Sequence, residues 1–535
     1  GPRQASHRLK AAALAEATGD TRAADALRAK VLAETPGEAA AIVLDPTLRA
    51  RLRVSAFDAA RALLAAGRAD DAEPFATAAV ESGSRTREAL LLRATIRAAK
   101  GDRPGAEADY AEVLRRWPGH REATEVLYDR ARLALRSDDG PVARRRFENL
   151  LQRFPSHRRA DDALYLMADS YQDDRQRDPA YADRAIEAFD RLVRTRSGSY
   201  YADRSYMRAA HLSYALGRWA EAERRYAGYR GGESAREARY WLARTLQQRG
   251  RDGRAAEILR SLARSDDYYA LLSRDRLRGG SRVEFTDVGY GPGPRPPGPA
   301  SAGVMFDDPA GRRTALLLSF GERAWARDEV AGLVERTRGD RGRLGALAPA
   351  LADWGFPGLA LRVGYRLGGE DHRWAWPVAF HAALDREGSA HGLDPWYVLA
   401  LIRQESLWRA GVVSSADARG LMQILPRTGR EIAEAEGWIG FDESELFDPP
   451  VNLHFGARYL EDQLRRFEGF WPAVLAAYNG GPHVVAVWWD FPERTLDPEL
   501  WVDRIPYKET REYVRKIVAQ RARYRELHGR ARASR

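Results

Sequence analysis

The sequence contains no cysteine, so disulfides, thiol nucleophiles and cysteine-ligated metals are excluded. Lysine is almost absent too, and the net charge of +10 therefore comes nearly all from arginine. The lysines are Lys10, Lys30, Lys100, Lys508 and Lys516. None of them follows a glycine, which excludes the Gly-Lys pair of a phosphate-binding P-loop. No His-Glu-x-x-His helix occurs, and the histidines near the C-terminal end (His391, His454, His483) are scattered. We therefore expect no metal dependence and no cofactor.

Charge of a single sign is also missing. The 86 basic residues are interleaved with 76 acidic ones, whereas a nucleic-acid-binding protein typically shows a continuous basic stripe. We interpret the arginine bias as a trait of genome composition, and we predict no nucleic-acid partner. The remaining positive charge favours a mild attraction to polyanionic cell-wall material.

Long apolar runs are missing as well. Phe470–Trp489 contains no Asp, Glu, Lys or Arg, but Pro472 and the segment Asn479-Gly480-Gly481-Pro482 divide it into pieces too short to cross a membrane. We predict a buried helix, a turn and a second short segment there, and a soluble protein. The opening Gly1-Pro2 has the form of a protease scar, so we expect a trimmed N-terminus that hides any secretory signal.

The first half of the 535-residue chain is repetitive. Short turn units recur, each followed by an alanine-containing amphipathic stretch: Gly19-Asp20, Gly67-Arg68, Gly101-Asp102, Asp139-Gly140, Gly217-Arg218 and Gly250-Arg251. The intervals from Gly67 to Gly101 and from Gly217 to Gly250 are 34 and 33 residues, the period of tetratricopeptide-like helix-turn-helix repeats. We predict a tetratricopeptide-like α-superhelix (a solenoid) over residues 1–285.

A Pro/Gly-rich stretch marks the clearest boundary. Residues 286–303 include the segment Gly291–Pro299, whose density of proline and glycine cannot continue a helix. Residues 304–374 return to a helical pattern. We therefore predict a second part at 286–375, the linker plus a small helical domain, and a third part at 376–535.

One carboxylate in the third part stands on an apolar helix face. Asp394 suits the N-cap and Pro395 the first position of a helix. Its apolar stripe consists of Val398, Leu401 and Ile402. The next position on that stripe is Glu405. Burial raises the pKa of a carboxylic acid, as a general acid working near neutral pH requires. From spacing alone, a structural glutamate paired with Arg403 or Arg409 explains the position equally well.

Four downstream pieces favour catalysis. In order they are Ser414, Gly420-Leu421-Met422-Gln423-Ile424-Leu425-Pro426, Ala477-Tyr478-Asn479-Gly480-Gly481-Pro482, and Ile505-Pro506-Tyr507-Lys508-Glu509-Thr510-Arg511-Glu512-Tyr513-Val514. This series resembles the catalytic domain of soluble lytic transglycosylases, which is similar to goose-type lysozyme. The resemblance covers about the last 160 residues. It implies a mainly α chain that ends in a lysozyme-like α (α+β) domain, with the superhelix forming a curved or closed ring.

The resemblance also implies a reaction. In that family a glutamate, here Glu405, protonates the β-1,4 glycosidic oxygen between N-acetylmuramic acid and N-acetylglucosamine. The same carboxylate then removes the proton of the muramyl 6-hydroxyl, which closes a 1,6-anhydro ring without consuming water. Peptidoglycan glycan strands are the implied substrate, the periplasm the implied location, and cell-wall synthesis or divisome proteins the implied partners of the superhelix.

Further site residues follow from the same match. Ser414 is expected to contact the muramyl sugar, or else to be a turn hydroxyl. Tyr478 is expected to reach the catalytic carboxylate or the substrate, or else to be core. The remaining implied substrate-binding positions are Met422, Gln423, Thr428, Asn479 and Glu509, where Met422 is equally compatible with the core and Glu509 with a helix cap.

One position departs from the family pattern. Asp417 stands where the family usually has glycine, three residues before Gly420. If its side chain points into the cleft, a second carboxylate is available and hydrolysis competes; we expect it to face outward. The alternatives are therefore a hydrolase of goose-type lysozyme kind on the same fold, and a solenoid scaffold with a vestigial catalytic domain.

Overall fold

The computed structural model describes residues 2–83, 85–120, 122–279, 285, 302–369 and 372–529. These residues form helices joined by short turns, and among them there is no β-strand, only two isolated bridges, Val413 with Arg419 and Arg419 with Ile424. The prediction of an all-α chain is confirmed. The chain divides into two compact units, Gly1–Leu212 and Ser213–Arg535. Residues 286–301 of the predicted linker lie outside the described residues, and the three-part division stays a prediction.

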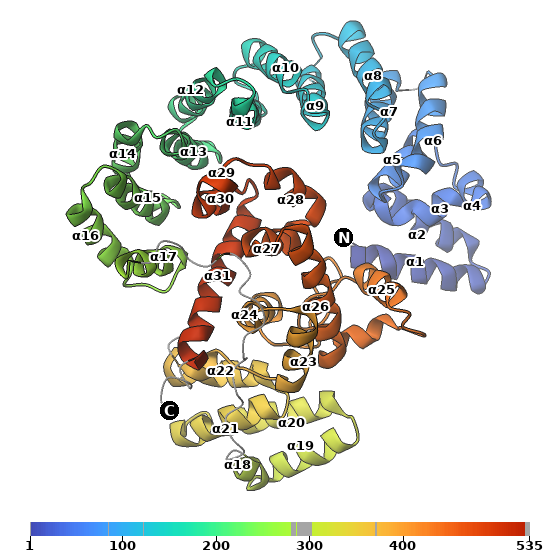
Figure 1. Cartoon of the computed structure of the whole chain (residues 1–535). Helices are drawn as coiled ribbons and strands as arrows, with labels where there is room; N and C mark the ends of the chain where they lie inside the picture. The colour runs from blue at the N-terminus through green and yellow to red at the C-terminus, as the bar shows by residue number, and fades with distance from the viewer. Residues whose placement is uncertain are drawn as a thin grey trace. The chain divides into compact units, whose positions relative to one another are not determined.

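The first unit consists of helices that pair with their sequence neighbours (Figure 1). They are α1 (Pro2–Ala17), α2 (Thr21–Glu34), α3 (Ala40–Leu44), α4 (Pro46–Arg51), α5 (Ala56–Ala65), α6 (Ala69–Glu81), α7 (Thr86–Lys100), α8 (Arg103–Arg116), α9 (Ala123–Arg136), α10 (Gly140–Arg153), α11 (Ala160–Asp173), α12 (Ala180–Thr195) and α13 (Ala202–Ala215), which runs across the boundary between the units. Two 3₁₀ turns, η1 (Pro36–Ala39) and η2 (Asp174–Gln176), lie between them. Fully buried alanines on adjacent helices let the pairs pack closely, as in a tetratricopeptide-like array.

The predicted turn units lie between paired helices. In five of the six the glycine has a positive φ, between 69° and 85°, a conformation that costs other residues about 1–2 kcal/mol. The sixth differs, because Asp138 takes the left-handed conformation (φ 56°) while Gly140 opens α10. Asp139 then caps α10 by accepting a hydrogen bond from the Val142 amide. Aspartate tolerates this conformation better than most residues, so the turn forms without glycine at that position.

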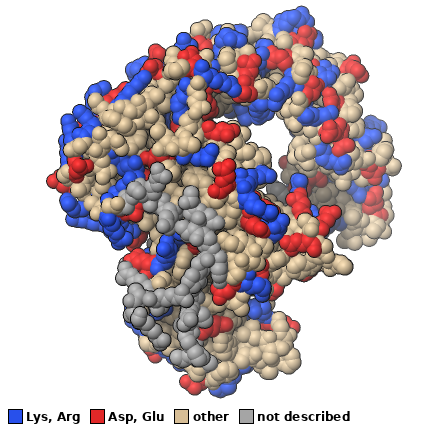
Figure 2. All heavy atoms as spheres, in the orientation of Figure 1, with Lys and Arg blue, Asp and Glu red and all other residues tan. Residues whose placement is uncertain are grey.

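Charges of both signs cover the visible surface. Figure 2 shows lysine and arginine interspersed with aspartate and glutamate over the drawn face, with no continuous basic stripe there. This distribution agrees with the interleaving of the sequence and does not favour a nucleic-acid interface.

The second unit begins with four more helices: α14 (Trp219–Gly228), α15 (Ala235–Gln248), α16 (Asp252–Leu262) and α17 (Tyr268–Leu277). A small helical group follows, with α18 (Ala302–Phe306), α19 (Pro309–Ser319), α20 (Arg323–Arg336), α21 (Arg341–Asp353) and α22 (Pro357–Gly368). This group has its own apolar core, which includes Val330, Leu347, Leu351 and Val363. The helical pattern predicted for residues 304–374 is confirmed.

The remainder of the unit carries the predicted catalytic residues. Its elements are η4 (Arg373–Ala375), α23 (His381–His391), α24 (Pro395–Ser406), α25 (Pro426–Ala435), η5 (Glu443–Phe447), α26 (Pro449–Arg466), α27 (Trp471–Gly480), α28 (Pro482–Trp489), α29 (Glu493–Leu496), α30 (Pro498–Arg504) and α31 (Lys508–His528). The uncharged segment 470–489 forms α27, a turn at Gly481 and α28, as predicted. No helix among the described residues is long and apolar enough to cross a membrane.

Buried charges join α15 and α17 to the segment around α30. The Glu499 carboxylate is almost fully buried and accepts a hydrogen bond from the Tyr240 hydroxyl at 2.6 Å. Arg276 donates to its other oxygen at 2.7 Å, and Arg244 contacts both Glu499 and Asp497. Removing such charges from water is costly, and these hydrogen bonds satisfy them.

A second buried cluster fixes α31. The Asp503 carboxylate, fully buried, accepts hydrogen bonds from the Trp241 indole at 2.6 Å and the Tyr269 hydroxyl at 3.0 Å. Arg515 on α31 contacts Asp503 and Glu237 of α15, each at 2.6 Å. The position of α31 is therefore set by α15 and α17 as well as by its own neighbours.

Candidate active site

The helix that carries Glu405 begins as predicted. The Asp394 side chain accepts a hydrogen bond from the Trp396 amide at 2.8 Å, and Pro395 occupies the first turn of α24. Asp394 is itself buried and paired with Arg521 of α31 at 2.7 Å. The Asp394 side chain therefore caps α24 with one oxygen and holds it against α31 with the other.

Among the residues that the structure describes, no basic side chain pairs with Glu405. Arg403 donates instead to the Ala375 carbonyl at 2.5 Å and to the Tyr365 hydroxyl at 2.9 Å, while Arg409 donates to the Ser406 carbonyl at 3.1 Å. The structural alternative of an arginine-paired glutamate is therefore wrong. Burial without a compensating positive charge raises the pKa of Glu405 to about 7.

The hydroxyl that meets Glu405 comes from Tyr513 on α31. Tyr513 donates a hydrogen bond to Glu405 Oε1, and this interaction lowers the pKa of Glu405 against the larger effect of burial. The hydroxyl of Tyr478 donates to the Met422 carbonyl at 2.6 Å. Burial, and after it the charge of Glu405, raises the pKa of Tyr478, so the expected role of Tyr478 towards the carboxylate or the substrate stays a prediction. Tyr513 is a hydrogen-bonding partner of Glu405 that the sequence did not single out.

The loop after α24 is built around a glycine and an asparagine. Gly420 has a φ of 80°, and the side chain of Asn452 on α26 bonds the loop on both sides of Gly420. Asn452 accepts from the Met422 amide at 2.7 Å and donates to the Arg419 carbonyl at 2.9 Å and the Leu446 carbonyl at 2.8 Å. Asn452, fully buried, thereby determines the shape of the Gly-Leu-Met-Gln segment.

Replacing Gly420 by alanine is expected to destabilise the domain by roughly 2–5 kcal/mol. A Cβ there would lie 2.2 Å from the Leu446 carbonyl oxygen and 2.3 Å from Asn452 Nδ2, and the positive φ adds its own cost. Urea denaturation measures the change. Gly437→Ala is the matched control, since Gly437 has a φ of 68° but no atom within 4 Å of the added carbon. The control should lose only about 1–2 kcal/mol, and equal losses for the two variants would contradict the clash.

The Met422 side chain belongs to the core. It is fully buried and packs on α26 at Gly456, where an added Cβ would lie 2.2 Å from the Met422 sulfur. A substrate-binding role for this side chain is therefore wrong, because glycine at 456 lets α26 approach and cover it. The Met422 backbone carbonyl is used by Tyr478, as described above.

Ser414 and Gln423 hold the same loop. The Ser414 hydroxyl accepts hydrogen bonds from the amides of Ala416 and Ala418, at 3.2 and 3.0 Å, which is the turn role expected as one of its two readings. The Gln423 side-chain amide donates to the carbonyls of Val412 and Gly420, at 3.2 and 2.9 Å. Contacts of either side chain with a sugar stay predictions.

Asp417 is an exposed residue. Its φ of 65° is left-handed, and its carboxylate forms an ion pair with Arg419 at 3.0 Å. More than half of the Asp417 side chain is accessible. The expectation that it faces outward agrees with this placement. The Asp417 carboxylate pairs with the guanidinium of Arg419.

The other expected residues lie on α25, α27 and α31. Thr428 is half-buried in the first turn of α25. Asn479 is exposed near the end of α27, and its side-chain oxygen accepts a hydrogen bond from the Thr510 hydroxyl at 2.7 Å. Glu509 is exposed in the first turn of α31, where its charge also favours the helix dipole. Thr510 and Tyr513 belong to the sequence motif around Glu509, but the sequence predicted no role for either of them.

The arrangement offers one acid rather than a pair. A carboxyl group with a pKa near 7 is populated in both protonation states at neutral pH, so it can give a proton and take one back. Tyr513 fixes the orientation of the group, and Tyr478, whose pKa is raised by burial and by the charge of Glu405, bonds the loop held by Asn452 and Gln423.

Comparison with known proteins points to the part of the chain that contains Glu405. The family described as Transglycosylase SLT domain matches residues 383–495, and the family described as Outer membrane lipoprotein matches residues 85–229. Soluble lytic murein transglycosylase of Salmonella typhimurium is 29% identical over 296 residues, covering 55% of this chain and 44% of that protein. The Escherichia coli (strain K12) protein of the same name is 29% identical over 295 residues, with the same coverage. The chain thus matches less than half the length of these curated relatives.

The fold has a solved counterpart. The crystal structure of the 70-kDa soluble lytic transglycosylase from Escherichia coli superposes with a TM-score of 0.54 at 19% sequence identity. The match covers 99% of this chain and 97% of that one. At this identity the likeness establishes the fold alone.

Proposed function

We propose that the chain, whose residues 383–495 match the Transglycosylase SLT domain family, is a peptidoglycan lytic transglycosylase. It cleaves the β-1,4 bond between N-acetylmuramic acid and N-acetylglucosamine and forms a 1,6-anhydromuramyl product. The observation that carries the proposal is Glu405: a half-buried carboxyl group with a pKa of about 7, a tyrosine donor and no basic partner among the described residues.

A single carboxylate suits this reaction better than hydrolysis. Hydrolytic glycosidases usually place two carboxyl groups about 5–10 Å apart, one of them as nucleophile or as base for water. Here the one additional candidate considered, Asp417, is exposed and bound to Arg419. A reaction whose nucleophile is a hydroxyl of the substrate itself needs no second carboxylate, because the first can serve as acid and then as base.

The steps follow from the protonation states of Glu405. The neutral acid donates its proton to the glycosidic oxygen as the bond to the muramyl C1 breaks, and the carboxylate that remains faces the positive charge developing at C1. It then accepts the proton of the muramyl 6-hydroxyl as that oxygen bonds to C1. Glu405 ends protonated again. Because no water is added, the two fragments together have the same composition as the glycan before cleavage. Tyr513 stabilises the ionised state between the two transfers.

The test is the mass of the released fragments. Purified sacculi incubated with the protein should yield muropeptides one water molecule lighter than those from a hydrolytic muramidase run in parallel. Products of full mass with free reducing ends would instead establish the hydrolase. Absence of any release, where the muramidase control works, would favour the scaffold.

The activity should fall with rising pH above neutrality. The first step needs protonated Glu405, so kcat/KM is expected to drop about tenfold per pH unit above a pKa near 7. In Tyr513→Phe the carboxylate loses the donor that lowers its pKa, and the falling limb should move to higher pH. A pH profile of sacculus solubilisation measures both.

Tyr478→Phe is the matched control for that profile. It removes a hydroxyl that bonds the Met422 carbonyl rather than the acid, so the limb should stay where it is, whatever the change in rate. Equal limbs in wild type and Tyr513→Phe would show that the hydrogen bond does not tune Glu405.

The remaining roles extend the proposal. Ser414, Gln423, Thr428, Asn479 and Glu509 are assigned to the sugar and amide groups of the glycan, and the helical array of the first 285 residues to guiding strands or to contact with cell-wall synthesis or divisome proteins. A murein substrate supports a periplasmic location for the protein. The relatives' names, which are murein transglycosylases, support the substrate class.

A further inference from the structure

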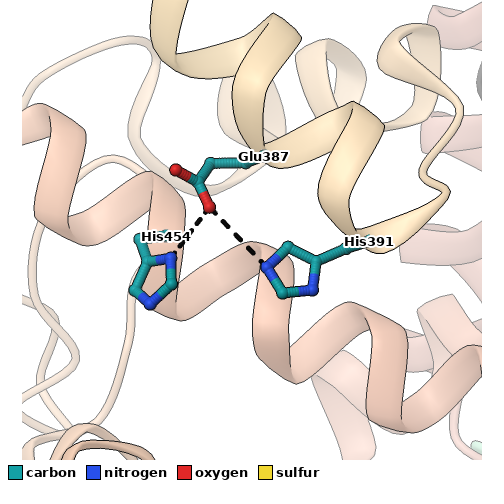
Figure 3. A group of neighbouring side chains, drawn as sticks. All are labelled: Glu387, His391 and His454. Atoms are coloured by element: carbon teal, nitrogen blue, oxygen red, sulfur yellow. Dashed lines mark hydrogen bonds and ion pairs between the residues drawn. The ribbon is translucent and has the colours of Figure 1, made fainter. Parts of the chain in front are cut away.

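Two histidines and a glutamate converge away from Glu405, on α23 and α26. Glu387 and His391 lie one turn apart on α23, and His454 comes from α26 (Figure 3). Glu387 Oε2 lies 2.8 Å from His454 Nδ1 and 3.6 Å from His391 Nε2, and the three atoms lie within 4.8 Å of one another. The glutamate is only 6% exposed, while both rings remain partly accessible.

The outer nitrogen of each imidazole is bound by a carboxylate. His391 Nδ1 lies 2.8 Å from Glu461 Oε2, and His454 Nε2 lies 2.7 Å from Glu436 Oε2. A metal needs the lone pair of the inner nitrogen of each ring, so its binding would release the proton that His454 Nδ1 shares with Glu387 Oε2 at 2.8 Å. The carboxylate–histidine pairing, present twice, is the usual surrounding of histidine ligands in metal sites.

The charges around the cluster balance. The three carboxylates that contact the histidines are those of Glu387, Glu436 and Glu461. Three arginines meet them: Arg386 donates to Glu387 Oε1 at 2.7 Å, Arg458 contacts Glu461 at 2.6 Å, and Arg465 lies 4.0 Å from Glu461. With neutral imidazoles, three negative charges against three positive ones cancel, so a cation meets no net positive charge. Arg386 occupies the outer oxygen of Glu387 and leaves Oε2 to the histidines.

An apolar wall closes one side. The ring of His454 lies against Trp438 and Phe455, with ring centroids 5.9 and 5.7 Å apart. Such a wall lowers the local polarity and strengthens ligand–cation attraction. A shell of two imidazoles, one carboxylate and one open position matches the ligand chemistry of zinc.

We propose that Glu387, His391 and His454 bind a zinc ion, with a water molecule as fourth ligand. Zinc–ligand bonds of 2.0–2.1 Å give a tetrahedral edge of roughly 3.3 Å. The separations of 2.8 and 3.6 Å from Glu387 Oε2 lie on either side of that edge, so small side-chain rotations suffice. The proposal departs from the expectation, drawn from the sequence, that no metal is bound.

The site joins two helices that support the loop beside Glu405. His454 precedes Gly456 by two residues on α26, and Gly456 packs against Met422. An ion held between α23 and α26 thus fixes the backbone on which this loop rests, and its role is structural. It supplies no group to the cleavage of the glycan, so its test is independent of the proposed function.

Zinc binding by the untagged full chain, stripped with chelator and then titrated with zinc chloride in a calorimeter, tests the proposal. One ion per chain with a Kd below about 1 μM is expected. His391→Ala and His454→Ala should each weaken binding at least about 100-fold, and Glu461→Gln, which keeps all three ligands, about 10–100-fold. His120→Ala is the matched control, because His120 lies 3.6 Å from the single carboxylate Glu122 and should leave binding unchanged.

Circular dichroism of each variant shows whether weaker zinc binding results from a missing ligand or from unfolding. Glu461→Gln makes the same distinction with all three ligands in place. Binding only at millimolar zinc by the wild type would overturn the proposal. So would submicromolar binding that survives in folded His391→Ala and His454→Ala.

Discussion

Glu405→Gln is expected to reduce the release of anhydromuropeptides by roughly 10²–10⁴-fold, the contribution of proton transfer by a positioned acid. Glutamine has the same shape and accepts the Tyr513 hydrogen bond, but it can neither donate a proton to the glycosidic oxygen nor take one from the 6-hydroxyl. Mass spectrometry of muropeptides from sacculi measures the loss. The isosteric change Glu329→Gln on α20, a half-buried carboxylate paired with Arg313, is the control and should leave the release unchanged.

The same variant should be more stable than the wild type at alkaline pH. The pKa of Glu405 is raised from 4.5 to about 7 in the folded state, so the unfolded chain loses this proton first as the pH rises. Stability therefore falls between about pH 4.5 and 7, and by up to about 3 kcal/mol once the buried group is ionised. Glutamine does not ionise, so above pH 7 the variant should be the more stable protein. Below pH 4.5 the wild-type carboxyl group is protonated too, and the variant should gain no such advantage. Urea denaturation of wild type and Glu405→Gln at pH 4.5 and 8 measures the difference. If the difference in stability between the two proteins were the same at both pH values, a raised pKa of Glu405 would be contradicted.

Arg515→Ala is expected to destabilise the second unit by roughly 3–5 kcal/mol, because it leaves buried carboxylates short of a partner. Arg515 contacts Asp503 and Glu237, which are both almost fully buried, each at 2.6 Å. Tyr513 lies two residues earlier on α31, so the hydrogen bond to Glu405 should loosen as well. Urea denaturation gives the stability, and the pH limb of kcat/KM in the folded fraction should move upward, as in Tyr513→Phe.

Glu512→Ala provides the matched control for Arg515. It removes the remaining ion pair of the same guanidinium, at 2.8 Å and 43% exposed on the glutamate side, and leaves the buried contacts in place. Exposed pairs contribute about 1 kcal/mol or less. A loss in Arg515→Ala no greater than in Glu512→Ala would show that the buried cluster does not hold α31.

Local patterns in the sequence located the acid and its helix. Asp394, Pro395 and the apolar stripe act within one or two turns of α24, and such short-range rules predicted the cap and the burial of Glu405. The turn glycines of the helical array were predictable for the same reason, since a left-handed residue is needed wherever a hairpin closes tightly.

Long-range contacts decided what the sequence could not show. Tyr513 meets Glu405 from 108 positions away, and no periodicity links them. Met422 became core because Gly456, on another helix, lets α26 approach. The pairing of His391 with Glu387 follows helix spacing, but His454 joins them only through the packing of α23 on α26. Asp417 was expected to face outward, but its left-handed conformation was left open because aspartate adopts both signs of φ.

The hydrogen bond between Tyr513 and Glu405 has a consequence for the timing of activity. A ribosome adds about 5–20 residues per second, so Tyr513 emerges roughly 5–20 seconds after Glu405. Until then the acid lacks its donor, and α24 lacks the α31 residue that pairs with its cap. The surroundings of the acid are therefore complete only when the last helix, α31, docks on α24.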